Sequence, residues 1–399
     1  MNSAGTYILP SYENNIQKIY LIKMLANMHF ISAILVPFFT KWGGITFSQI
    51  LYLNSAFMFF VFILEVPTGT VADFFGRKVS MQISCFVSCA AVLTYISYPD
   101  FYVFLAAEFI FAVGASLMSG ADSAFIYDTL KELGRSHESK VIYGRAESFK
   151  LAGILIGAFF GSFIAKIDLR APFLLMALPI VLAGLITFFL KEPPAFGTEE
   201  KKTYGKTLFE GISYFIRKDE LKILVIDMVL VGAMSWLVIY FYQIFLMGAN
   251  VDVKYFGPVH SAMALAQIII IQNFTGIEKL FGDKKTLLSL GAVIPGICFI
   301  LMGTVKSAPV LIIVIVLAAG FGLSRTPLFI NYMNKFIPSD KRATVLSVTS
   351  MLRMIAISVT NLLAALLSDW SVPWTIIMFG CLLCLFPFIV RVKESHLID

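Results

Sequence analysis

Long apolar runs separated by short polar segments form the dominant pattern of this chain. A membrane-spanning helix requires about 20 mostly apolar residues, and runs of this length are typical of helices, not of strands. The pattern therefore predicts an all-α integral membrane protein with twelve transmembrane helices. We place them at residues 16–40, 46–70, 79–98, 101–128, 142–165, 170–190, 221–247, 254–275, 285–304, 308–335, 344–367 and 372–391.

One connection is longer than the others and divides the chain. Residues 191–220 are rich in Lys, Glu, Gly and Pro, and they separate a six-helix bundle over 1–190 from a second bundle over 221–399. Within this linker, residues 207–220 place apolar side chains on one helical face, which predicts a helix lying at the membrane interface. The loops GTVADFFGRK (69–78) and GIEKLFGDKK (276–285) occupy equivalent places in the two bundles. We therefore expect two pseudo-symmetric halves around a central cavity.

Composition and charge agree with a membrane location. The chain is 58% hydrophobic, with 38 Phe and a mean hydropathy of +0.84, which excludes an ordinary soluble protein. If the N-terminus is cytoplasmic, 23 of the 31 Lys and Arg residues lie in cytoplasmic segments and 5 lie in outer loops. Because cations are enriched on the cytoplasmic side, we expect both termini inside, in a bacterial cytoplasmic (inner) membrane. The net charge of +6 then reflects sidedness, and no nucleic-acid partner is expected.

The loop after the second predicted helix combines glycines with charges. Gly69, Asp73, Gly76, Arg77 and Lys78 follow one another at fixed spacing. The glycines permit close helix approach and a tight turn, while the two cations hold the loop on the cytoplasmic side. This spacing resembles the signature of the major facilitator superfamily, and the twelve spans resemble it over the whole chain. The resemblance implies that Asp73 latches the cytoplasmic side of the outward-open state, near the eleventh helix; a charged turn that only fixes sidedness is the alternative.

The fifth predicted helix carries a second resemblance. Gly144, Gly153, Gly157 and Gly161 are spaced as in the antiporter signature of exporting members, although Ala158 and Ser162 replace its Pro and one Gly. Small residues at such intervals also describe any closely packed membrane helix. Export and simple packing therefore both remain open. A third segment, PSDKRATVLS at 338–347, is similar to a loop of bacterial members and supports the family alone.

Ionisable residues inside spanning helices are costly unless paired or hydrated, so each one is a candidate for function. Seven such residues are Glu65, Glu108, Asp122, Lys150, Asp227, Arg325 and Arg353. Residue counts along the helices, at about 1.5 Å each, put Glu65 and Arg353 at similar depths. Since the second and eleventh helices pack together in the resembled fold, we expect a Glu65–Arg353 bridge that closes the cytoplasmic gate, with a static ion pair as the alternative.

Two more pairs lie at comparable depths, Asp122 with Lys150 and Asp227 with Arg325. In the resembled fold the first, fourth, seventh and tenth helices line the cavity, which makes these four residues candidates for proton or substrate contact. Purely structural pairing is the alternative. Glu108 has no evident partner and is a candidate proton carrier. His29 is a second titrating candidate, because histidine exchanges protons near neutral pH, although a packing role is the alternative.

The sequence contains no P-loop, nucleophile elbow or metal-spaced His and Cys cluster. We therefore expect no enzyme activity, cofactor or metal, and the CxxC of Cys381 and Cys384 is interpreted as packing. The predicted protein is a monomeric secondary transporter with alternating access. Proton-coupled export of a small amphipathic or drug-like molecule is the main hypothesis. The alternatives are uptake or exchange of an organic anion or metabolite, favoured by Lys150, Arg325 and Arg353, and a non-transporting membrane sensor or scaffold.

Overall fold

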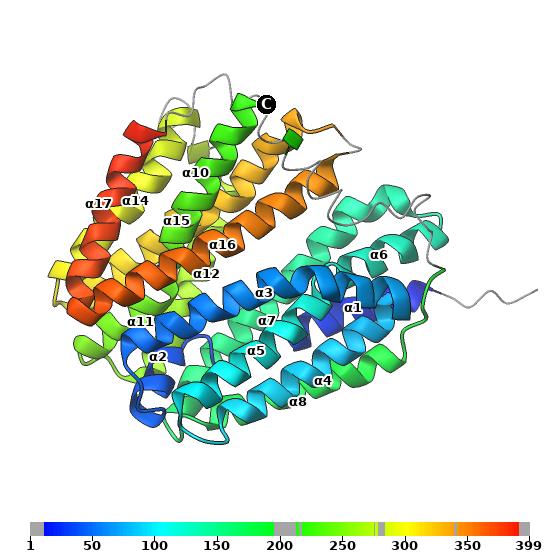
Figure 1. The fold of residues 1–399 in the computed structure, drawn as a ribbon, viewed down its shortest axis with the longest axis horizontal. Helices are drawn as coiled ribbons and strands as arrows, with labels where there is room; N and C mark the ends of the chain where they lie inside the picture. The colour runs from blue at the N-terminus through cyan, green and yellow to red at the C-terminus, as the bar shows by residue number, and fades with distance from the viewer. Residues whose placement is uncertain are drawn as a thin grey trace, which may run out of the picture.

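The computed structural model describes residues 12–194, 213–214, 218–274, 276–277, 284–338 and 341–390. Within these ranges the regular elements are all helical (Figure 1). Helices suit this chain because lipid offers no partner for backbone N–H and C=O groups, and a helix satisfies them within one segment. Most of the predicted interfacial helix at 207–220 and most of the loop at 276–285 lie outside the described residues.

The first half of the chain contains α1 to α8. Its helices are α1 (Glu13–Ala26), α2 (Leu35–Pro37), the π-helix η1 (Phe38–Trp42), α3 (Phe47–Phe75), α4 (Arg77–Tyr95), α5 (Phe101–Met118), α6 (Ala121–Glu132), α7 (Ser139–Ala165), which follows the short 3-10 helix η2 (Ser136–Glu138), and α8 (Ala171–Phe188). Side-chain caps fix two helix starts: Thr46 forms a capping box with Gln49 before α3, and Asp100 caps α5.

The second half contains α10 to α17. Its helices are α10 (Asp219–Trp236), α11 (Val238–Gly248), α12 (Phe256–Gln272), which follows the 3-10 helix η3 (Val253–Tyr255), α14 (Lys284–Thr304), α15 (Ala308–Phe336), α16 (Arg342–Trp370) and α17 (Val372–Ile389). Among the described residues, eleven segments are long and apolar enough to span a membrane, and they correspond to the second to twelfth predicted spans.

The first predicted span, 16–40, is not a continuous helix, and in this respect the prediction is wrong. The backbone leaves the helix after Ala26 and returns to it at Leu35. The fourth span is also interrupted, at Ser119 and Gly120 between α5 and α6, where Gly120 has φ +75°. Both interruptions lie beside the central cavity described below.

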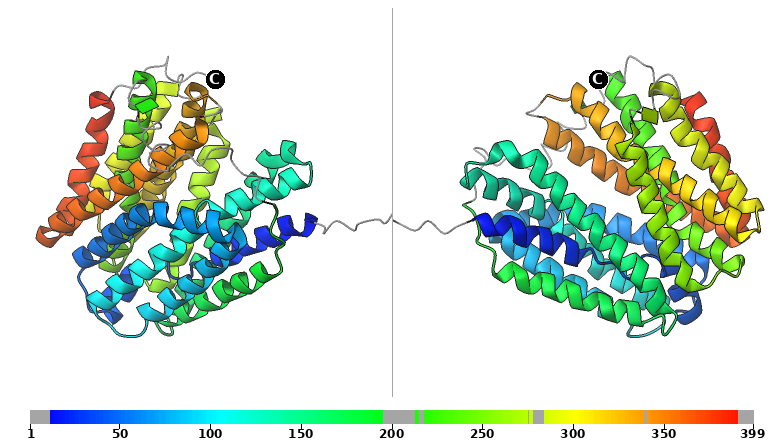
Figure 2. Two further views of the ribbon diagram at one scale, coloured as in Figure 1. Left: turned by 45° about the vertical axis from the view of Figure 1, so that its right-hand side comes forward. Right: turned by 180° about the vertical axis from the view of Figure 1, so that it is seen from behind.

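The helix pairing of the first half recurs in the second, as expected for two repeats. α3 packs on α5 as α12 packs on α15, and α4 packs on α8 as α14 packs on α17. Similarly, α1 packs on α7 as α10 packs on α16. The halves meet through α3 against α16 and α7 against α12 (Figures 1 and 2). The structure is thus the predicted pair of pseudo-symmetric helical halves.

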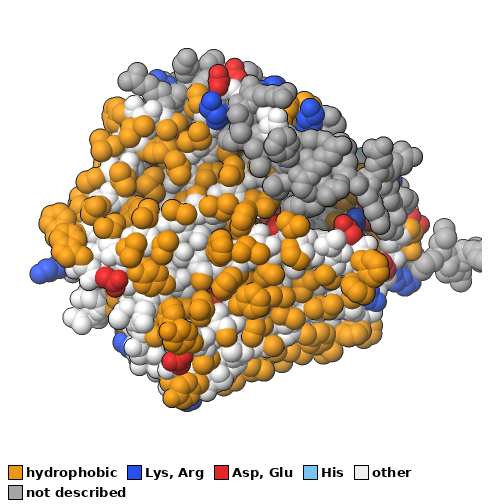
Figure 3. Space-filling model, in the orientation of Figure 1, with side chains coloured by type: hydrophobic (Ala, Val, Ile, Leu, Met, Phe, Trp, Pro, Cys, Tyr) orange, Lys and Arg blue, Asp and Glu red, His pale blue; other side chains and the backbone are white. Residues whose placement is uncertain are grey.

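The surface is broadly apolar. Figure 3 shows hydrophobic side chains covering the face formed by α3, α4, α16 and α17, with charged side chains mostly near its rim. Large exposed side chains on these helices include Phe59, Leu93, Leu363 and Leu385. Such a surface is stable in lipid but not in water, so the outer faces of these helices fit a bilayer.

Candidate functional site: a central cavity with a charge-balanced wall

A cavity of about 710 Å³ lies between the two halves. The first half provides all four charged side chains that line it, Lys23, Asp122, Glu147 and Lys150. The second half provides aromatic and apolar groups together with His260. The volume lies within the range of small-molecule sites, roughly 300–1,000 Å³. One wall is therefore ionic, and the facing wall is largely apolar.

The broken first span contributes backbone and side chains to this cavity. Between Ala26 and Leu35 the ordinary helical bonds give way to shorter turns, such as His29 N–H to Asn27 C=O at 2.8 Å. Asn27, His29 and Ser32 from this stretch line the cavity. Irregular backbone at membrane depth is tolerated where it lines a cavity or is buried in protein. Interrupted helices are also a common mark of transporter binding sites.

The glycine stripe of α7 accommodates this break. A Cβ at Gly157 would lie 2.7 Å from His29 N, and Cβ atoms at Gly153 and Gly161 would overlap the carbonyl groups of Met24 and Phe30. Three of the four glycines therefore allow the broken segment to pack directly on α7. Gly144 has no neighbour within 4 Å of an added Cβ, so packing does not explain it.

Groups from the second half complete the broken backbone. Gln243 is fully buried; its Oε1 accepts from Val36 N–H at 2.9 Å, and its Nε2 donates to Ser32 C=O at 3.1 Å. The Tyr242 hydroxyl donates to the neighbouring Ala33 C=O at 3.4 Å. These bonds join α11 to the first span across the two halves. They also compensate backbone groups that the interruption would leave unpaired in a buried place.

Among the described residues, the polar contacts between the halves lie at one end of the molecule. We call it the Gly44 end, after the turn before α3, and we call the opposite end, with the turn before α4, the Gly76 end. Ser55 and Ser358 hydroxyls lie 3.1 Å apart, Ser162 donates to Lys254 C=O at 2.9 Å, and Lys166 lies 3.5 Å from Asp252. In the described residues these contacts close the Gly44 end, while the halves diverge toward the Gly76 end (Figure 2).

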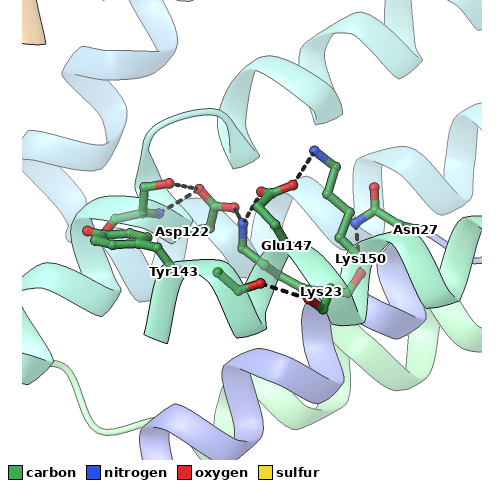
Figure 4. Close-up of polar contacts among 9 residues, drawn as sticks. Lys23, Asn27, Asp122, Tyr143, Glu147 and Lys150 are labelled. Atoms are coloured by element: carbon green, nitrogen blue, oxygen red, sulfur yellow. Dashed lines mark hydrogen bonds and ion pairs between the residues drawn. The ribbon is translucent and has the colours of Figure 1, made fainter. Parts of the chain in front are cut away.

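The charged wall is a connected network (Figure 4). Lys23 Nζ lies 2.7 Å from Asp122 Oδ2 and 3.3 Å from Glu147 Oε1, and Lys150 Nζ lies 3.2 Å from Glu147 Oε2. Asp122 also accepts from the backbone and hydroxyl of Ser123. Two lysines and two carboxylates thus balance one another along the cavity. The predicted Asp122–Lys150 pair is wrong, because α1 inserts Lys23 beside Asp122.

Lys23 and Glu147 are network members that the sequence interpretation missed. Lys23 is one of the 23 cations that the loop analysis assigns to cytoplasmic segments, although it lies seven residues inside the predicted span 16–40. Glu147 lies inside the predicted span 142–165. Treating every charge inside a predicted span as a candidate, including those near its border, finds both of them.

The Asp227–Arg325 ion pair is present as predicted, but it lies away from the cavity. Asp227 is 4% and Arg325 is 2% exposed, and Arg325 also donates to Leu288 C=O and stacks over the Phe329 ring. Neither residue lines the cavity in the described structure. The expectation that this pair faces substrate or protons from the cavity wall is therefore wrong; the geometry is that of an internal tie between α10, α14 and α15.

Glu65 and Arg353 do not form the predicted bridge in this conformation. Glu65 Oε1 accepts from the Ser119 hydroxyl at 3.3 Å, while its Oε2 is buried without a hydrogen-bond partner. Arg353 makes no ion pair with any described carboxylate. Glu108 does have a partner, contrary to expectation, because its carboxyl interacts with the Tyr95 hydroxyl, outside the cavity lining.

The signature loop between α3 and α4 is a tight glycine turn fixed by side-chain hydrogen bonds. Gly76 has φ +93°, a conformation that favours glycine. Glu192, just after α8, accepts from the backbone N–H groups of Arg77 and Lys78 at 2.9 and 2.8 Å, and Arg77 pairs with Asp128. The carboxylate therefore satisfies the otherwise free N–H groups at the start of α4.

Two members of the signature do not act as expected here. Gly69 has no neighbour within 4 Å of an added Cβ, so the close helix approach expected there is absent. Asp73 is exposed at the end of α3 and makes no hydrogen bond or close ion pair with another described residue. The loop is held by Arg77, Lys78 and Glu192, and Glu192 was not singled out from the sequence.

Two helical halves around a central cavity, closed at one end by cross-half bonds, define the class of this protein as an integral membrane carrier. The sequence profile of the Major Facilitator Superfamily matches residues 19–361. The chain belongs to this superfamily and is a membrane transporter. A curated relative is the uncharacterized MFS-type transporter YxaM of Bacillus subtilis (strain 168), which is 22% identical over 298 residues covering 72% of each chain.

Solved structures resemble the fold closely despite low sequence identity. The nucleoside transporter NupG superposes with a TM-score of 0.81 at 13% identity, covering 94% of this chain and 98% of that chain. A bacterial homolog of the human lysosomal transporter Spinster, described as inward-facing and unoccupied, superposes with a TM-score of 0.76 at 15% identity and covers all of both chains. These likenesses support the fold alone, because the sequence identities are low.

Proposed function

We propose that this protein is a proton-coupled secondary transporter that carries a small amphipathic molecule across the bacterial cytoplasmic membrane. The observation that carries the proposal is the Lys23–Asp122–Glu147–Lys150 network on the cavity wall. Its charges sum to zero, so cargo that is neutral overall enters without disturbing the balance. Of the three cations that favour an organic anion, Arg325 and Arg353 are absent from the described cavity lining, and Lys150 lines it but is paired with Glu147.

The network offers a physical route to coupling. Asp122 is 16% exposed and faces Lys23, which is 8% exposed. If Asp122 accepts a proton, Lys23 loses one of its counter-charges in a poorly hydrated place. The free energy needed to enclose the network away from water then rises, because one ion pair has been lost. Proton binding therefore biases one arrangement of the two halves over the other, which is the requirement for coupled alternating access.

The spacing that favoured export has a structural explanation. Gly153, Gly157 and Gly161 pack on the broken first span, so they do not argue for a direction of transport. The charge asymmetry of the loops supports a cytoplasmic position for the Gly76 end. With that sidedness, the cavity in this conformation faces inward, because the described cross-half bonds close the Gly44 end.

We propose that Glu65 and Arg353 pair when the Gly76 end closes. Ser55 and Ser358 fix the register of antiparallel α3 and α16. From this contact Glu65 lies about 15 Å and Arg353 about 7.5 Å toward the Gly76 end, at about 1.5 Å per residue, and an arginine side chain spans the difference. The buried, unpartnered Oε2 of Glu65 gains a partner in that closed state. Asp73, at the same end of α3, is the second candidate latch.

The test uses purified protein in vesicles that contain a pH-sensitive dye. The compounds are uridine, L-phenylalanine, alanyl-phenylalanine, tetraphenylphosphonium and benzoate. We expect a pH change with at least one net-neutral compound, an at least tenfold smaller change in Asp122→Asn, and retained counterflow exchange in that variant. Asp168→Asn, at an exposed turn paired with Arg170, is the matched control. An undiminished pH response in Asp122→Asn contradicts the coupling role.

A further inference from the structure

The two residue pairs of the ionic network, Lys23 with Asp122 and Glu147 with Lys150, differ in how exposed their side chains are. Lys23 and Asp122 are 8% and 16% exposed, whereas Glu147 and Lys150 are 53% and 40% exposed. All four side chains line the cavity, but Glu147 and Lys150 offer a molecule there the larger accessible surface, and Lys23 and Asp122 are the more buried members. This difference separates groups suited to holding a proton from groups suited to contacting cargo.

Glu147 and Lys150 present opposite charges side by side. They lie one turn apart on α7, with Lys150 Nζ 3.2 Å from Glu147 Oε2 (Figure 4). A partly exposed pair of this kind contributes little to stability because water screens it, so cargo can replace it at low cost. An ammonium and a carboxylate a few ångströms apart replace both partners at once. A singly charged molecule leaves one side chain without a counter-charge in a semi-enclosed site, which is unfavourable.

The rest of the cavity suits an apolar side group. Phe57 and Phe111 line it from the first half, and Trp236, Ile239 and Tyr240 line it from the second. Aromatic walls bury a ring or aliphatic chain with a gain roughly proportional to the apolar area covered. The volume of about 710 Å³ is sufficient for a small peptide. Charge recognition on one wall and apolar contact on the other thus define an amphipathic cargo with two opposite charges.

We propose that the cargo is a zwitterion of the amino-acid or short-peptide class with an apolar or aromatic side group. Its carboxylate contacts Lys150, and its ammonium contacts Glu147. This inference rests on the proposed transport function and assigns the chemical class of its cargo. It also makes Glu147 and Lys150 specificity-determining residues, whereas Asp122 carries the coupling.

The experiment measures ligand-induced thermal stabilisation and affinity of the purified full-length protein. The probes are L-phenylalanine and alanyl-phenylalanine, each with its C-terminal amide, its N-acetyl derivative and the doubly blocked form, together with uridine. We expect the zwitterion to bind at least tenfold more tightly than any blocked form. Lys150→Gln is expected to erase the difference between the zwitterion and its amide, and Glu147→Gln the difference between the zwitterion and its N-acetyl form.

A purely structural role for the pair predicts a different result, because both substitutions then weaken all ligands alike. Lys140→Gln, an exposed position on the same helix outside the cavity, is the matched control and should keep the wild-type preference. The inference is overturned if blocked forms bind as tightly as zwitterions, if no zwitterion binds, or if the variants show no ligand selectivity. Coupled transport of uridine or tetraphenylphosphonium would overturn the zwitterion class while leaving the transport function intact.

Discussion

Replacing Gln243 by Leu tests whether the second half holds the broken first span. Leu keeps much of the volume but removes the acceptor of Val36 N–H and the donor to Ser32 C=O. Ser32 lines the cavity, so its carbonyl can find water, whereas Val36 is fully buried. A buried donor left without a partner costs about 1–3 kcal/mol.

This cost applies only while the Gly44 end is closed, because opening that end exposes Val36 to water. The substitution therefore raises the ratio of open to closed molecules by the same free energy, which corresponds to roughly 5–150-fold. The unfolded protein pays no such cost, so the melting temperature of the closed form should fall as well. The expected result is a shift of population toward the state open at the Gly44 end.

The measurement uses spin labels at Lys41→Cys and Tyr255→Cys, exposed positions on the two sides of the Gly44 end, in a background without the five native cysteines. The long-distance population should grow in Gln243→Leu. Gln267→Leu is the matched control, because the bond of Gln267 among the described residues stays within its own helix, to Met263 C=O at 3.4 Å. Identical distance distributions in Gln243→Leu and the control would refute the role assigned to Gln243.

Three further predictions concern packing and internal ties. Gly157→Val should prevent the first span from packing on α7 and lower stability by at least the roughly 1–3 kcal/mol of an overpacked core, whereas Gly144→Val should leave the melting temperature nearly unchanged; equal losses would contradict the packing account. Arg325→Met should cost about 3–5 kcal/mol by leaving Asp227 buried and unpaired, and adding Asp227→Asn should recover most of it; a double variant as unstable as the single one would count against an internal tie. Glu192→Ala should lower stability by about 0.5–2 kcal/mol through the lost cap of α4, measurable as a lower melting temperature that Glu192→Asp partly restores; an unchanged temperature would argue that the cap is unimportant.

Much of the fold followed from local pattern. Apolar runs of spanning length predicted the second to twelfth helices because lipid forces each crossing segment to satisfy its own backbone. The equivalence of the two loops likewise predicted the repeated halves. The break in the first span was not visible locally, since residues 27–34 are as apolar as a helix requires. Two of its backbone groups, Val36 N–H and Ser32 C=O, are bonded by Gln243, which lies more than 200 positions away in the chain.

For the candidate site too, the sequence predicted some features and only the tertiary structure decided the others. The sequence by itself determined that charges lie inside spans, because each such residue is rare and costly in lipid. It did not determine their partners: residue depth paired Asp122 with Lys150, but the tertiary structure places Lys23 between Asp122 and Glu147. Depth along an axis is a local property, since every residue adds the same rise. Which helices are neighbours, and therefore which charges meet and which face a cavity, is decided only when all helices pack together.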